Sequence, residues 1–426
     1  MSKPTFVLFL FLIFCIPAIF GQKYDEYFFN KACRVDFHLS GNAKTTNAYL
    51  YRVAQEPIWG GRRTHLSVDA NLGEYRFRVI DSLSNSLIYT DGFSTLYYEW
   101  QSTPEATAVN KSFEQSIQFP FPKKTVQLII EKRMDFSNWE TLTQFYISPT
   151  DQLIRQTKAT AEVKNIVKNV EPAHAIDIAV IAEGYTTKQK AKFYKDAQRL
   201  SESLLSHEPF KSYKSKINIY AIATVSADTG VSAPQKGIWQ NSALGAHYHT
   251  FYSERYLTTP NVFTLRDYAS LVPYDAIYIL ANTKTYGGGG IYNFYTLASA
   301  DSKKAQSEVV VHEFGHSFAG LADEYFYDSD ALDEMYDLKI EPWEPNITTL
   351  VKFDAKCKNK LPVSTLLPTP LTDETKQKIG VFEGGGYRKK GIYRPYFDCR
   401  MRTNAAKDFC PVCEKAVEER IKFLTE

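Results

Sequence analysis

The segment His312-Glu313-Phe314-Gly315-His316 combines residue types that can bind a metal ion and activate a water molecule. On a helix, side chains four positions apart lie on one face. His312 and His316 would therefore direct two imidazoles at one point, as two protein ligands of a zinc ion do. Glu313 lies beside the first ligand, within reach of a metal-bound water, and is the candidate general base.

The residues after the motif offer a third ligand. Gly320 suits the end of a helix, because glycine adopts the left-handed backbone that turns the chain back. Such a turn could bring either Asp323 or Glu324 to the two histidines. Three protein ligands leave a fourth position for water, which is typical of a catalytic zinc site rather than a structural one.

The alternative is a chance pattern on an amphipathic helix whose histidines are exposed or hydrogen-bonded. Histidine is scarce, with 8 in 426 residues, so a chance pair is less expected. The motif also follows the apolar run Val309–Val311 and precedes the glycine turn. This combined context favours a metal site that binds one catalytic Zn²⁺.

The composition is that of a globular protein with 44% hydrophobic and 23% charged residues. A length of 426 residues favours two or three domains. The formal net charge is +2 and no block of Lys and Arg stands out, so nucleic acid is not expected as a partner. The aromatic content of 14% favours β-rich structure.

The N-terminus has the features of a signal peptide over residues 1–21. Lys3 supplies a positive charge, residues 6–20 are almost wholly apolar, and Gly21 offers a small residue at a cleavage point. The sequence before Cys15 loosely resembles a lipoprotein signal, but the bulky Phe14 argues against lipidation. We therefore expect a mature chain without a transmembrane segment, located in the periplasm, at the cell surface or outside the cell.

Signal removal leaves five cysteines, an odd number in a compartment that permits disulfides. Cys410 and Cys413 form a Cys-x-x-Cys pair that could be a redox pair or half of a metal site. The pair lacks thioredoxin-like surroundings and a second Cys-x-x-Cys, so a structural disulfide involving the C-terminal cysteines is favoured. The pairing stays open among these cysteines: Cys33, Cys357, Cys399, Cys410 and Cys413.

Residues 22–150 are predicted to form an all-β sandwich domain. Polar and apolar residues alternate in short segments that turn-forming residues separate. The segments are 33–39, 74–80 and 125–130, and the turns are 40–42, 71–73 and 90–92. We expect this domain to support the fold or bind a substrate, and to carry no chemistry; residues 151–170 are predicted to be a linker.

Residues 171–426 are predicted to form an α/β (α+β) domain that holds the motif. Three apolar stretches suit strands of a buried sheet, and residues 186–207 have the periodicity of a helix. The strands are expected at 176–182, 217–223 and 276–280, and a closing helix at 414–424. The glycines of Tyr286–Tyr292 suit an edge strand that pairs with an extended peptide, or a flexible surface loop.

The motif His312-Glu313-x-x-His316-x-x-x-Gly320-Leu321-x-Asp323-Glu324-Tyr325 resembles that of the bacterial IgA-peptidase family of zinc metallopeptidases. Residues 182–186 and 399–402 also resemble family segments, and the β-rich region resembles the N-terminal domain of the family. The resemblance covers roughly residues 170–426 as the peptidase domain. It implies a secreted zinc endopeptidase that acts on a protein or peptide substrate.

The family is in turn similar to the metzincins, which implies a metzincin-like zincin fold. The metzincin pattern has glycine three residues after the second histidine, whereas this chain has Ala319 there and the glycine at 320. If Gly320-x-x-Asp323 is the shifted equivalent, Asp323 is the third ligand and Glu324 its rival. Met401 is the candidate for the methionine below the metal, with a plain core residue as the alternative.

The chemistry that follows is peptide-bond hydrolysis, with Glu313 taking a proton from water and delivering it to the leaving amine. A tyrosine hydroxyl could stabilise the oxyanion. Tyr393 and Tyr396 lie near Met401, but Thr403 stands where some metzincins have their tyrosine, so no residue is assigned. The alternatives are an exported binding module with an inactive peptidase-like domain, and a zinc amidase that acts on cell-wall peptide.

Overall fold

The computed structural model describes residues 23–300, 305–327, 335–356, 361–362, 364–403 and 405–426. The predicted signal peptide, Cys15 and Cys357 lie outside these ranges. Within them, the helices are all too short or too polar to cross a membrane.

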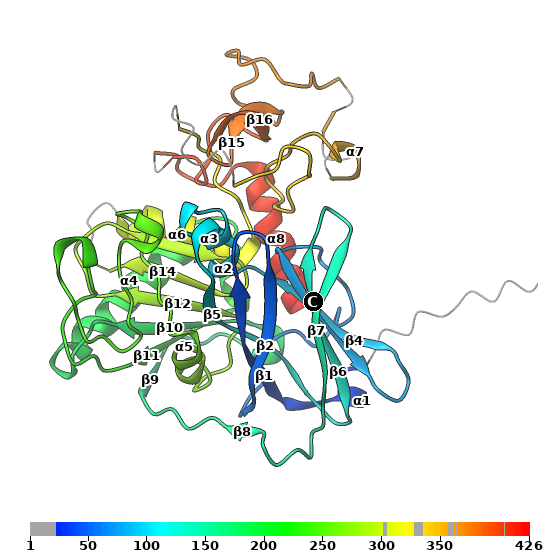
Figure 1. Cartoon of the computed structure of the whole chain (residues 1–426). Coiled ribbons are helices and arrows are strands. Elements are labelled where there is room, and N and C mark those ends of the chain that lie inside the picture. Colours follow the sequence, from blue (N-terminus) through cyan, green and yellow to red (C-terminus); the bar gives the residue numbers. More distant parts are fainter. Residues whose placement is uncertain (1–22, 301–304, 328–334, 357–360, 363, 404) are drawn as a thin grey trace, which may run out of the picture.

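The N-terminal part contains two four-stranded sheets (Figure 1). Buried apolar side chains from both sheets form one core. One sheet has the order β5-β1-β2-β8 and the other β4-β3-β6-β7. All pairs are antiparallel except β2 with β8. The elements are α1 (Tyr24–Tyr27), β1 (Phe28–Gly41), β2 (Thr46–Glu56), β3 (Tyr75–Asp81), β4 (Leu87–Phe93), α2 (Leu96–Gln101), α3 (Pro104–Ala108), β5 (Lys111–Pro122), β6 (Val126–Arg133), β7 (Trp139–Ile147) and β8 (Arg155–Gln156).

One turn predicted from the sequence is wrong, because residues 90–92 lie inside strand β4. Gly92 is needed there for a close approach rather than for a turn. A Cβ atom on Gly92 would lie 1.8 Å from the carbonyl oxygen of Leu72. Asp91 is buried and pairs with Arg62 at 2.7 Å, so its charge does not place it in a solvent-exposed turn.

The second part is built on a six-stranded sheet of order β13-β14-β12-β10-β11-β9. The four inner strands run parallel, and the edge strands β9 and β13 are antiparallel to their neighbours. The strands are β9 (Glu162–Val167), β10 (Ile176–Glu183), β11 (Ile217–Ala223), β12 (Ala276–Ala281), β13 (Gly288–Ile291) and β14 (Tyr295–Ser299). Edge strand β9 thus comes from the stretch 151–170 that the sequence indicated as a linker.

Helices cover both faces of this sheet, and every residue of its central strand β10 is therefore buried. Ile178 and Val180 face a core shared with α4 (Lys190–Ser206), α6 (Ala305–Ala319) and α8 (Pro411–Thr425). Ala179 and Ile181 face α5 (Val262–Ala269) on the other side. The remaining elements are η1 (Pro172–His174), η2 (Thr187–Gln189), η3 (Lys214–Lys216), η4 (Pro234–Lys236), η5 (Thr250–Tyr252), α7 (Phe353–Lys356), β15 (Phe382–Gly385) and β16 (Arg388–Arg394).

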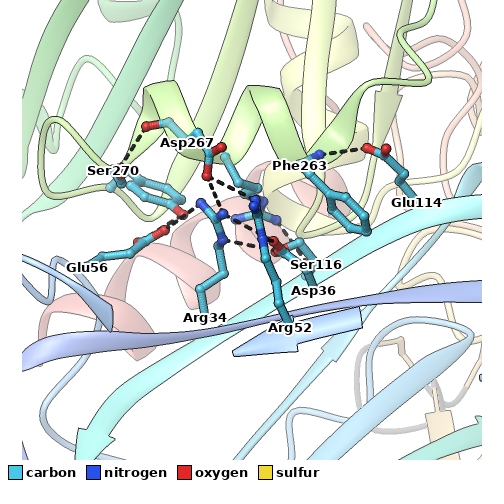
Figure 2. A network of polar contacts seen from close by, with 11 residues as sticks. Arg34, Asp36, Arg52, Glu56, Glu114, Ser116, Phe263, Asp267 and Ser270 are labelled. Atoms are coloured by element: carbon cyan, nitrogen blue, oxygen red, sulfur yellow. Dashed lines mark hydrogen bonds and ion pairs between the residues drawn. The ribbon is translucent and has the colours of Figure 1, made fainter. Parts of the chain in front are cut away.

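A buried ionic network joins the two parts, and Figure 2 shows it between β1, β2 and α5. Arg34 pairs with Asp36 and Glu56 at 3.1 Å each and also contacts Asp267 of α5. Arg52 pairs with Asp36 at 2.5 Å and with Asp267 at 3.1 Å. Arg34, Asp36 and Glu56 are at most 1% exposed. Their ion-pair partners must therefore compensate for the hydration that each group loses on burial.

Replacement of Arg34 by methionine should destabilise the protein strongly. It leaves the buried Glu56 without its ion-pair partner and Asp36 with Arg52 alone, and the loss of one partner from a buried pair costs roughly 3–5 kcal/mol. The midpoint of urea unfolding should fall accordingly. The control is Lys376→Met, which breaks an exposed pair with Asp373 and should change stability by at most about 1 kcal/mol. Equal midpoints for the two variants would contradict this account of the interface.

Candidate active site

Helix α6 carries the His-Glu-x-x-His motif and ends where the sequence places its glycine. Gly320 has a φ of +65°, and its N–H donates to the carbonyl of His316 at 3.0 Å. This left-handed cap turns the chain back across the end of the helix. A Cβ atom at this position would lie 2.6 Å from the ring of Trp343, so glycine is needed for space as well as for backbone freedom.

The turn brings Asp323 onto the two histidines. The Nε2 atoms of His312 and His316 lie 3.1 Å apart, and Oδ1 of Asp323 lies 3.0 and 3.3 Å from them. Glu324, the rival ligand, points away and accepts from Asn346 and Cys413 instead. The structure therefore brings together His312, His316 and Asp323, and not Glu324.

Hydrogen bonds on the far side of each ring set the histidine tautomers. Nδ1 of His312 lies 2.9 Å from the carbonyl oxygen of Arg400, and Nδ1 of His316 lies 2.5 Å from that of Leu321. A carbonyl only accepts, so both Nδ1 atoms carry the proton in the neutral rings. Both Nε2 lone pairs consequently face each other and the Asp323 carboxylate, as in histidines that ligate metals.

Three acceptor atoms packed this closely need a positive charge between them. Tetrahedral ligands about 2.0–2.1 Å from a zinc ion are spaced about 3.3 Å apart, close to the distances seen here. Two imidazole nitrogens and one carboxylate oxygen are also a donor set that zinc accepts. The residues present therefore fit a divalent metal ion.

The electrostatics of the site also attract positive charge. Burial lowers the pKa of His316, but the charges of Asp323 and Glu313 outweigh it and raise this pKa to about 9. Burial raises the pKa of Asp323, but the two histidines hold it well below its usual value. A cation-binding site with an ionised carboxylate follows from both shifts.

Glu313 lies between its helix and the glycine-rich edge strand β13. Burial raises the pKa of Glu313, although the neighbouring histidines lower it. A Cβ atom on Gly288 would lie 3.2 Å from a carboxylate oxygen of Glu313, and one on Gly290 would lie 2.1 Å from its main-chain oxygen. The glycines thus allow the strand to approach the motif, and β13 is an ordered edge strand rather than a flexible loop.

Met401 packs beneath the motif helix. It is fully buried, and its sulfur would lie 3.0 Å from a Cβ atom placed on Gly315. Its carbonyl accepts from the N–H of Glu324 at 2.8 Å. Met401 and Arg400 therefore fix the helix and the turn relative to each other, and the sulfur of Met401 lies against Gly315 of the helix.

Several residues at the site carry no sequence signal. Tyr387, after β15, donates a 2.5 Å hydrogen bond to Oδ2 of Asp323. Asn346 holds both backbone groups of Ala322 at 2.7 and 2.9 Å. Neither Tyr393 nor Tyr396 reaches this position: Tyr393 pairs through its backbone with Thr348, and the hydroxyl of Tyr396 bonds to Gln377.

The N-terminal part also approaches the site, through Glu99 of α2. Tyr256 donates a short hydrogen bond to Glu99. Burial raises the pKa of Glu99 to about 7, and the charges of His316 and Glu313 are close enough to influence it. The N-terminal domain therefore contributes an ionisable group beside the motif, which the sequence did not indicate.

Comparisons with known families agree with this geometry. A family model described as IgA Peptidase M64 matches residues 164–378 and 371–421, and one described as Peptidase M64 N-terminus matches residues 23–143. The chain belongs to the IgA peptidase M64 family. No curated protein matches it. M64 membership makes the chain a metallopeptidase, so the resemblance seen in the sequence is confirmed.

Replacement of Tyr387 by phenylalanine should weaken metal binding by about 10–100-fold, because it removes the hydrogen bond that orients Asp323. Zn²⁺ affinity is measured by competition with a chelator of known affinity. The matched control is Tyr393→Phe in the same hairpin, whose hydroxyl forms no hydrogen bond to the described residues. Equal affinities for the two variants would show that Tyr387 does not orient the ligand.

Proposed function

We propose that this M64 peptidase is an exported, zinc-dependent endopeptidase with Glu313 as its general base. The observation that carries the proposal is the convergence of two Nε2 atoms and one Asp323 oxygen within 3.0–3.3 Å of one another. Glu313 lies next to them on the same helix. The proposed ligands are His312, His316 and Asp323, with water at the fourth position.

Zinc at this position would supply a water of lowered pKa and polarise the scissile carbonyl. Glu313 accepts the proton of the attacking water and delivers it to the leaving amine. Its burial supports this role, because a raised pKa makes the carboxylate a stronger base. Arg400 and Leu321 keep the imidazole protons on Nδ1, so that Nε2 stays free for the metal.

We further propose that the catalytic part is metzincin-like. Asp323 stands at the position that a shifted glycine turn gives to the third ligand, and Met401 packs below the motif helix. The extra residue before Gly320 is accommodated at the end of the helix, whose cap still directs the chain back to the histidines. These contacts support the relationship through geometry rather than through sequence spacing.

The proposed substrate is an extended segment of a protein or peptide. β13 is an edge strand next to Glu313; Tyr256 bridges its Gly288 end, and a substrate backbone could pair with the rest of the strand. Export is proposed from the apolar N-terminus after Lys3. The competing functions are an exported binding module and a zinc amidase that acts on cell-wall peptide. Terminal mapping of the peptides released from a proteome digest distinguishes an endopeptidase from the amidase.

Glu313→Ala should retain zinc and lose at least about 100-fold in peptidase turnover, because it removes the proton acceptor and no ligand. Zinc content and cleavage of a mixed protein substrate are measured on the same preparation. The control is Glu419→Ala, an exposed helical glutamate on α8. Substantial turnover by zinc-loaded Glu313→Ala would remove Glu313 from the mechanism.

Removal of the metal with a chelator should abolish cleavage, and added zinc should restore it, because the proposed mechanism needs the ion to lower the pKa of the attacking water and to polarise the scissile carbonyl. The assay compares release of peptide termini before chelation, after it and after zinc addition. A zinc-loaded wild-type protein that cleaves no protein substrate would favour the binding module instead.

A further inference from the structure

A second cluster of potential metal ligands lies behind the candidate active site. It consists of Glu324, Cys399, Cys410 and Cys413, whose ligand atoms all lie within 4.8 Å of one another. All four residues are at most 3% exposed. The three cysteines are free thiols in the structure, which differs from the disulfide favoured by the sequence.

Three separate segments build this cluster. Glu324 follows the ligand Asp323, Cys399 precedes Met401, and the other two cysteines lie at the start of α8. The N–H of Cys410 donates to Sγ of Cys399 at 3.1 Å, and Sγ of Cys413 lies 3.1 Å from Oε1 of Glu324. The single Cys-x-x-Cys pair is thus completed by residues that are distant in sequence.

The carboxylate of Glu324 is poorly compensated by its neighbours. Asn346 donates to Oε1 at 3.0 Å, but Oε2 has no hydrogen-bond partner among the described residues. Glu324 is fully buried, and an unpaired buried carboxylate oxygen is costly. A cation among the four side chains would compensate this charge.

The donor types favour zinc over other common cations. Thiolates bind zinc well, whereas calcium and magnesium prefer sets of oxygen ligands. Four protein ligands form a closed tetrahedral shell, which is typical of a structural site rather than a catalytic one.

We propose that Glu324, Cys399, Cys410 and Cys413 bind a second, structural zinc ion. The two proposed zinc sites share no ligand. A disulfide would use two of the three thiols and leave the third beside an uncompensated carboxylate. A bound ion uses all four groups.

This ion would fix the parts of the chain that position the active site. One of its ligands, Glu324, directly follows Asp323 in the chain. Another, Cys399, directly precedes Arg400, whose carbonyl accepts a hydrogen bond from Nδ1 of His312. The ion would also tie α8 to both segments. The four residues are therefore positioning residues and contact no substrate.

The test counts zinc in the purified full chain and in three variants. Wild type should contain two zinc ions per chain. The double variant His312→Ala/His316→Ala should keep one, and X-ray absorption of that ion should show sulfur neighbours at about 2.3 Å. Cys413→Ala should lose the sulfur-bound ion, whereas the matched control Cys33→Ala, which replaces another buried thiol, should keep it.

Failure of this inference differs from failure of the proposed function. If the histidine site binds no zinc, wild type still contains one sulfur-bound ion and the double variant is unchanged. The inference is overturned if the double variant contains no zinc or zinc without sulfur neighbours. It is also overturned if mass spectrometry of the native protein finds a disulfide between two of the three cysteines. If Cys413→Ala does not fold, the double variant alone decides.

Discussion

The proposed active site depends on holding two imidazole lone pairs and a carboxylate oxygen in mutual contact. The Nε2 atoms of His312 and His316 are 3.1 Å apart, and Asp323 closes the triangle at 3.0 and 3.3 Å. Acceptors at these distances repel one another unless a cation or protons lie between them. The surrounding structure must therefore hold each group in place, and most of the contacts described above do this.

The groups that hold the triangle come from distant parts of the chain. The carbonyl of Arg400 orients His312 across 88 positions of sequence, and Tyr387 orients Asp323 across 64. Asn346 fixes the turn in between by bonding both backbone groups of Ala322. The long C-terminal part after the motif helix is thus required to build the proposed site, because it supplies Asp323 and the groups that orient Asp323 and His312.

The sequence was informative wherever the determinant is local. Helix spacing placed His312 and His316 on one face, Gly320 marked the end of α6, and unbroken apolar runs located β10, β11 and β12. It could not reveal Tyr387 or Asn346, because their roles arise from contacts between segments with no shared pattern. The turn expected at 90–92 failed for a similar reason: Gly92 is dictated by the approach of Leu72, not by local chain reversal.

The consecutive carboxylates Asp323 and Glu324 show why the cap of α6 matters more than the spacing of its motif. Their side chains point to opposite sides of the backbone. Asp323 points to the histidines, and Glu324 points to the cysteine cluster. The glycine turn sets which of the two side chains faces the helix. The hydrogen bond from the N–H of Ala322 to Asn346 and the one from the N–H of Glu324 to the carbonyl of Met401 hold the backbone in this orientation. A chain with its glycine one residue earlier would reach the histidines with a different register. The one-residue departure from the metzincin pattern is thus absorbed at the helix end, where the left-handed cap and the buried Met401 define the path of the chain.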